Sequence, residues 1–188
     1  MLGVELGGSV VQYDQAHTNS VYADAYQWNA GLYFESVASP YLKFRGSAGY
    51  TVYTPNTVPQ TNDFSGMYGQ LGLVHRLNKY VDYGLSGGRS INFGFFGGTI
   101  DLYSVRWQAN WHIIRDIGLS TSFTYENGTE IFSTLEKFER YGPGLTLSRN
   151  FTKKLSASLS YQFYNRNSNL ADRSYILNIV TLTIGYQF

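Results

Sequence analysis

Apolar and polar residues alternate along most of this chain, and the alternation is clearest over residues 174–188. Because a β-strand points successive side chains to opposite faces, this stretch has one apolar face and one face of mostly small or polar residues. The apolar face carries Ile176, Val180, Leu182, Ile184, Tyr186 and Phe188. The pattern predicts a strand that ends on an aromatic side chain, as at a boundary between membrane and water.

The same alternation recurs along the chain and predicts ten strands. They are expected at about residues 2–11, 21–34, 42–52, 67–77, 81–86, 103–113, 117–126, 141–148, 155–164 and 174–188. Long loops are expected at 14–20, 54–64, 87–98, 127–138 and 166–173, and the intervening connections are short turns. Short periplasmic turns and long extracellular loops are typical of outer-membrane barrels. The sequence therefore predicts an all-β, transmembrane, up-and-down antiparallel β-barrel of about ten strands, with both termini on the periplasmic side.

Aromatic side chains fall near both ends of the expected apolar faces. Amphipathic rings favour the two membrane–water interfaces, so a barrel should carry two aromatic girdles. The expected interface residues are Tyr22, Trp28, Phe34, Phe44, Tyr50, Tyr103, Trp111, Tyr125, Tyr161, Tyr186 and Phe188.

Composition agrees with a barrel and excludes several other classes. Aromatic residues make up 17% of the 188 residues, glycine occurs 20 times, and charged residues make up only 14%. The net charge of +1 gives no argument for nucleic-acid binding, and the absence of cysteine excludes disulfides and thiolate metal sites. We find no apolar run long enough for a transmembrane helix and no secretory signal segment, so a signal peptide is expected to be absent from this sequence.

The C-terminal quarter resembles a known class. The terminal strand ending in Tyr186-Gln187-Phe188 resembles the strand by which bacterial outer-membrane proteins are handed to the barrel-assembly machinery. The run 147–188 is similar to the last hairpins of β-barrel porins, some of which are found beside exopolysaccharide-export genes. This resemblance implies a bacterial outer-membrane location, with lipid and lipopolysaccharide around the barrel. Members of that group often have more than ten strands, so the chain is either a single barrel domain over 1–188 or the C-terminal part of a larger one.

Eight charged residues and one histidine on the inward parity are the candidate channel lining. They are Glu5, Glu35, Lys43, Arg45, Arg76, Asp82, Arg106, His112 and Glu126. They either select solutes in an open lumen or fill a narrow lumen with ion pairs, since a barrel of about eight strands is just filled by its interior side chains. Many small inward residues at 118–122 and 142–160 leave room for water or for an inserted loop, such as the segment with Phe93, Phe95 and Phe96.

An enzyme would need a positioned constellation of catalytic groups, and the sequence shows none. The candidate outer-rim groups are Asp14 with His17, Asp63, Asp101, and Glu126 with Glu130. His75 has outward parity and His112 lies near the periplasmic end, so no histidine, serine and acid share one rim in an evident motif. No catalytic, cofactor-binding or metal-binding residue is predicted. The expected function is a porin-like channel for polar solutes or part of an export porin, in a monomer. The alternatives are a plugged structural or surface-binding barrel, adhesin- or receptor-like, and an outer-membrane hydrolase.

Overall fold

The computed structural model describes residues 1–12, 24–56, 64–93, 99–114, 116–131 and 135–187, which contain ten strands and one short helix. The strands are β1 (Leu2–Val11), β2 (Asp24–Ser39), β3 (Leu42–Asn56), β4 (Phe64–Arg76), β5 (Val81–Phe93), β6 (Thr99–Ile114), β7 (Ile117–Ile131), β8 (Lys137–Asn150), β9 (Leu155–Ser168) and β10 (Tyr175–Tyr186). The 3-10 helix η1 (Ala171–Arg173) lies between β9 and β10. No helix in the described ranges is both long enough and apolar enough to cross a membrane.

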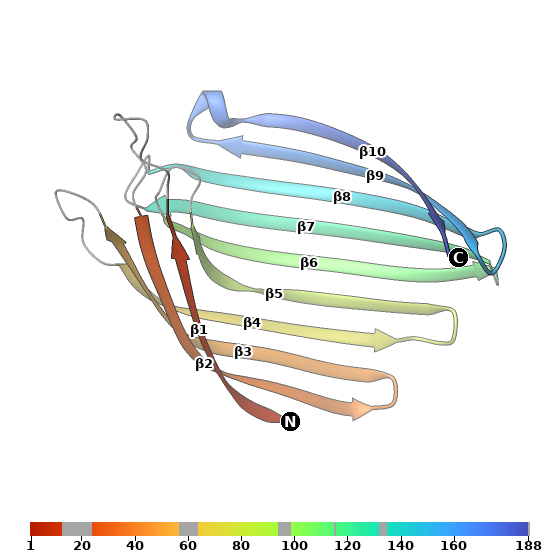
Figure 1. Cartoon of the computed structure of the whole chain (residues 1–188), viewed down its shortest axis with the longest axis horizontal. Coiled ribbons are helices and arrows are strands. Elements are labelled where there is room, and N and C mark those ends of the chain that lie inside the picture. The colour runs from red at the N-terminus through yellow and green to blue at the C-terminus, as the bar shows by residue number, and fades with distance from the viewer. Residues whose placement is uncertain (13–23, 57–63, 94–98, 115, 132–134, 188) are drawn as a thin grey trace.

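The ten strands form one sheet in which each strand pairs with the next along the chain. All the pairings are antiparallel, from β1 with β2 to β9 with β10. Figure 1 shows the sheet curved into a trough whose two margins are β1 and β10. The predicted all-β, up-and-down antiparallel fold is confirmed. The sheet is open, because no pairing joins β1 to β10 among the described residues.

Short turns gather at one end of the sheet and longer connections at the other, as predicted. The turn between β4 and β5 is held by Asn78, whose side-chain oxygen accepts hydrogen bonds from the backbone N–H groups of Tyr80 and Val81, at 2.7 and 3.0 Å. Thr152 holds the turn between β8 and β9 in the same way, through the N–H groups of Lys154 and Leu155. A side-chain acceptor at the start of a turn is a frequent reason for its sequence.

Four predicted loops are too long, because β3 continues to Asn56, β5 to Phe93, β7 to Ile131 and β9 to Ser168. The prediction of a loop at 87–98 is wrong for its first half, since β5 runs to Phe93. Gly88 lies within this predicted loop, yet it pairs with Gln70 and Ser104, and a Cβ at Gly88 would collide with the backbone of Gly69. Glycine there permits a close approach of strands rather than ending one. The loop at 127–138 is likewise too long, because β7 continues to Ile131 and β8 begins at Lys137.

Large apolar side chains are exposed on the convex face of the sheet rather than buried. Leu6 is 78% exposed, Trp28 65%, Leu71 64% and Leu182 68%. Among the described residues the buried apolar side chains are few: Ala25, Tyr53, Ile91, Ala109 and Phe138. A water-soluble protein rarely exposes a continuous apolar surface of this extent. The pattern is the one expected of a sheet whose convex face contacts lipid.

Candidate functional site: the concave face

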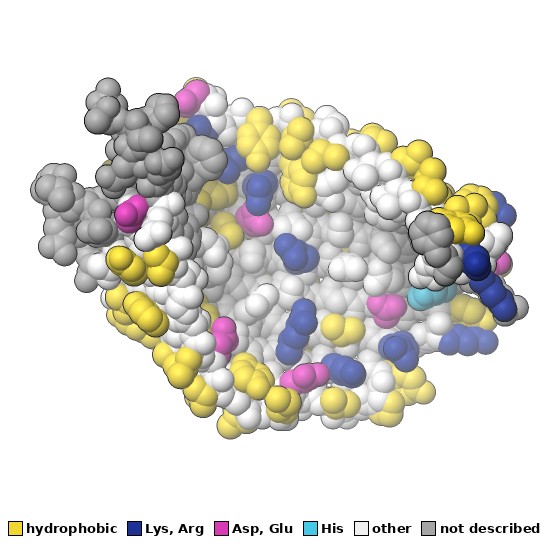
Figure 2. Space-filling view, viewed as in Figure 1, with side chains coloured by type: hydrophobic (Ala, Val, Ile, Leu, Met, Phe, Trp, Pro, Cys, Tyr) yellow, Lys and Arg dark blue, Asp and Glu magenta, His cyan; other side chains and the backbone are white. Residues whose placement is uncertain are grey.

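Strand register places all nine residues of the predicted lining on the same face of the sheet. Glu35 lies directly opposite Arg45, Arg76 opposite Asp82, and Arg106 opposite Ser86. Figure 2 shows Lys, Arg, Asp and Glu side chains gathered in the hollow of the trough, with apolar side chains along its margins. The residues on this face are Glu5, Glu35, Lys43, Arg45, Arg76, Asp82, Arg106, His112 and Glu126.

The predicted interface aromatics lie on the opposite, convex face. Trp28, Phe34, Phe44, Tyr50, Tyr103, Trp111, Tyr161 and Tyr186 are between 38% and 65% exposed. Tyr125 is half-buried and donates a hydrogen bond to Glu139 at 3.2 Å. Tyr22 and Phe188 fall outside the described residues.

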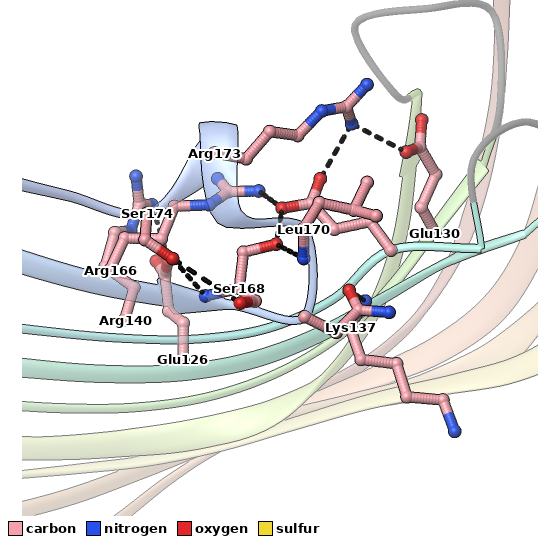
Figure 3. A network of polar contacts seen from close by, with 11 residues as sticks. Glu126, Glu130, Lys137, Arg140, Arg166, Ser168, Leu170, Arg173 and Ser174 are labelled. Carbon is pink, nitrogen blue, oxygen red and sulfur yellow. Dashed lines mark hydrogen bonds and ion pairs between the residues drawn. The ribbon is translucent and has the colours of Figure 1, made fainter.

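A network of arginines and glutamates occupies the long-loop end of the concave face (Figure 3). At its centre Glu136, which is 3% exposed, accepts hydrogen bonds from Arg166 and Arg173, both at 2.8 Å, and from the Ser168 hydroxyl at 2.6 Å. Arg173 also contacts Glu130 at 3.2 Å. Through these contacts one buried carboxylate joins the start of β8 to β9 and η1.

The electrostatics of the network favour the ionised carboxylate of Glu136. Burial alone would raise its pKa, but the hydrogen bonds from Ser168, Arg166 and Arg173 outweigh burial and set the pKa of Glu136 below its ordinary value of 4.5. The hydrogen bond to Glu136 raises the pKa of Arg173. The Glu136 carboxylate and the Arg173 guanidinium are therefore both charged at neutral pH, and their opposite charges neutralise each other.

A second salt bridge on this face joins β7 to β8. The Arg140 Nε atom donates to Glu126 at 2.7 Å, and the cation of Arg140 lies 5.7 Å from the ring centroid of Tyr164. Glu126 was predicted as a lining residue, either solute-selecting or ion-paired, and the structure shows it paired with Arg140. It therefore contributes no isolated charge to the hollow.

The C-terminal end of β5 contacts β2 across the concave face. The Gln27 side-chain amide donates to the backbone oxygen of Ile91 at 3.2 Å and to the Thr51 hydroxyl at 3.1 Å. Ile91 is 5% exposed and Tyr53 1%. The trough is therefore partly filled at this end. Of the predicted inserted segment, Phe95 and Phe96 lie outside the described residues, and for Phe93 only the backbone is described.

Charges nearer the short-turn end are arranged differently. Within the described residues, Glu5, Glu35 and Arg45 make no ion pair and no side-chain hydrogen bond, although all three line one hollow of about 360 Å³. Gly72 and Ser86 form part of its floor. The concave face thus has a charge-compensated zone at the long-loop end and a zone of unpaired charges further in.

Sequence reasoning missed most of the compensated network. Glu126 was predicted as a lining residue and Glu130 as an outer-rim group, whereas Glu136 and Arg173 were only assigned to loops, and no pairing among these residues was predicted. The alternation pattern could have placed two of the arginines on the inward face. Arg140 and Arg166 continue the inward alternation of β8 and β9 beyond the predicted ends of these strands. The pairing itself depends on strand register, which a single sequence specifies weakly in polar segments.

His75 and His112, the two histidines that the structure describes, belong to no group of three or more potential metal ligands among the described residues. His75 lies on the convex face, where its ring contacts the Tyr83 hydroxyl at 3.0 Å. His112 lies opposite Gly118 on the concave face. Asp14, His17 and Asp63 fall outside the described residues.

Comparisons with known proteins agree on the fold. No family model matches the chain, and neither does any curated protein. Among solved structures, OmpT, an outer membrane protein of Vibrio cholerae, aligns with a TM-score of 0.56 and 12% identity over 96% of this chain, and its loop L8 deletion mutant aligns with the same TM-score and identity over 95%. The NanC porin aligns with a TM-score of 0.54 and 8% identity over 100% of this chain and 98% of its own. This chain spans only 62% of the OmpT chain. The chain has the fold of outer-membrane β-barrel proteins.

Proposed function

We propose that this chain lies in a bacterial outer membrane and forms a porin-like pore for small polar solutes, or contributes its wall to a larger export pore. One observation carries the proposal: the sheet has an exposed apolar convex face and a hollowed concave face with unpaired charges. Lipid suits the first face and water the second. In this proposal the chain has no catalytic role, and the barrel-assembly machinery inserts it.

Insertion requires that the free edges of β1 and β10 find partners. Unpaired backbone groups in hydrocarbon cost several kcal/mol each, so open sheet edges do not occur there. In the membrane the two edges are therefore paired, either with each other or with further strands. Either arrangement encloses the concave face.

A plugged barrel is the second candidate, and a specific observation favours it. The contacts of Gln27 with Ile91 and Thr51 fill part of the long-loop end, where the glutamate–arginine network also lies. If these side chains close the lumen completely, the barrel would serve a structural or surface-binding role without conductance.

Single-channel recording in planar bilayers tests the pore. We expect stable open steps, and we expect Arg45→Gln with Arg106→Gln to lower the anion-to-cation permeability ratio on the order of fivefold, because two unpaired cations leave the lining. Lys153→Gln with Lys154→Gln removes the same charge from the exposed turn after β8 and should change the ratio much less. Absence of open steps from correctly folded protein would favour the plugged barrel.

A further inference from the structure

Three unpaired charges of both signs line one hollow on the concave face. Glu5 comes from β1, Glu35 from β2 and Arg45 from β3, and they surround a space of about 360 Å³. Tyr33, Gln70 and Ser86 add polar groups to the same wall. A volume of this size is in the range of small-molecule sites, which typically begin at about 300 Å³.

The charges of Glu35 and Arg45 are held apart although the two residues are direct cross-strand neighbours. Opposite residues of an antiparallel pair have Cβ atoms about 5 Å apart, close enough for an ion pair. No ion pair joins the two side chains, because the Arg45 side chain lies over Gly72, with Nε 3.3 Å and Cγ 3.4 Å from the place where a Cβ of Gly72 would be. Gly72 provides the space that lets the guanidinium turn toward β4 and β5.

This separation leaves a carboxylate side and a guanidinium side facing one hollow. Ser86, on the guanidinium side, is paired in register with Arg106, which brings a second positive charge beside the wall. The two acids and the two arginines balance in number. A solute that carries only one sign of charge would be repelled by the side of the lining that has the same sign.

We propose that the hollow binds zwitterionic solutes, namely free α-amino acids or short peptides, with the ammonium group at Glu5 and Glu35 and the carboxylate at Arg45. The planar guanidinium of arginine suits a carboxylate because it can donate two parallel hydrogen bonds. The proposal deepens the proposed pore function by naming the solute class. It concerns binding at one site and does not depend on the rate of passage.

Equilibrium binding to the full chain, folded in detergent, tests the site without requiring conductance. The probes are L-glutamine, which is zwitterionic, and glutarate, a dianion of similar size, each titrated by calorimetry. We expect L-glutamine to bind more tightly than glutarate. Glu35→Gln and Arg45→Gln should each weaken L-glutamine binding about tenfold, the effect of losing one charge-assisted hydrogen bond. Circular dichroism of each variant checks that the sheet is intact.

The same two variants separate this proposal from its rivals. At an anion site, the wild type would bind glutarate more tightly than L-glutamine, and Glu35→Gln would not weaken L-glutamine binding; either result would overturn the proposal. Equal affinity of wild type and Arg45→Gln for L-glutamine would also overturn it. The control Lys153→Gln with Lys154→Gln should bind as the wild type does. A barrel that binds L-glutamine but shows no open steps would contradict the pore and leave the site in place.

Discussion

Replacing Glu136 by glutamine should lower the free energy of unfolding by about 3 kcal/mol, because a buried carboxylate that serves two arginines is removed. Glu136 is 3% exposed, and the side chains of Arg166 and Arg173 are only 18% and 22% exposed. In the variant, the guanidinium groups of Arg166 and Arg173 would remain partly desolvated, and the carboxylate that neutralises their charge would be missing. Arg166 would keep its position 3.8 Å from the ring centroid of Phe138 as its main remaining contact.

Urea unfolding in detergent micelles, followed by tryptophan fluorescence, measures this effect. Glu139→Gln is the matched control, since Glu139 lies three residues further along the chain, in β8, but is exposed, and its loss should cost less than about 1 kcal/mol. The pKa of Glu136 is lowered in the folded state, so its stabilising contribution is present above the unfolded pKa and is lost as the pH falls through the folded pKa. The difference between wild type and Glu136→Gln should therefore shrink below about pH 4.5. Equal stability of the two proteins at pH 7 would show that the Glu136 network does not stabilise the fold.

Placing an arginine at Leu71 on the convex face should cost about 2–4 kcal/mol of stability in a bilayer, the penalty for a cation on the lipid face near mid-membrane. Leu71 lies in the middle of β4 and is 64% exposed. In water such a position would tolerate arginine at almost no cost. The size of the effect therefore reports which solvent contacts the convex face.

Gln70→Arg is the matched control, because Gln70 precedes Leu71 on the same strand and faces the other side of the sheet. Gln70 is exposed and has no side-chain hydrogen bond among the described residues, so arginine there should cost less than about 1 kcal/mol. Folding into lipid vesicles, with unfolding by guanidinium, compares the two variants. A similar small cost at both positions would mean that lipid does not contact Leu71.

The alternation of side chains was enough to predict which residues of each strand lie on the convex, apolar face and which lie on the concave, polar face. The parity that separates Trp28 from Gln27, or Leu71 from Gln70, follows directly from strand geometry and needs no partner strand. The ends of strands were harder. Gly88 and Gly128 suggest loops by composition, yet both lie within paired strands, where the absence of a side chain makes room for a neighbour.

The pairing of charges could not be predicted, because it depends on which residues become neighbours across strands. Glu35 and Arg45 face each other without an ion pair, whereas Glu136 pairs with Arg166, 30 residues away. The first outcome depends on the space above Gly72, and the second depends on where β8 begins. Neither feature can be seen in a single sequence before the register is known.

The native tryptophans give the most direct test of a lipid-facing convex surface. Trp28, Trp107 and Trp111 all lie on that face and are 65%, 38% and 46% exposed. In vesicles of lipids brominated on their acyl chains, we expect strong quenching of tryptophan emission, with little additional quenching by acrylamide in the water. Emission that brominated lipid leaves unchanged, and that acrylamide quenches efficiently, would contradict the account.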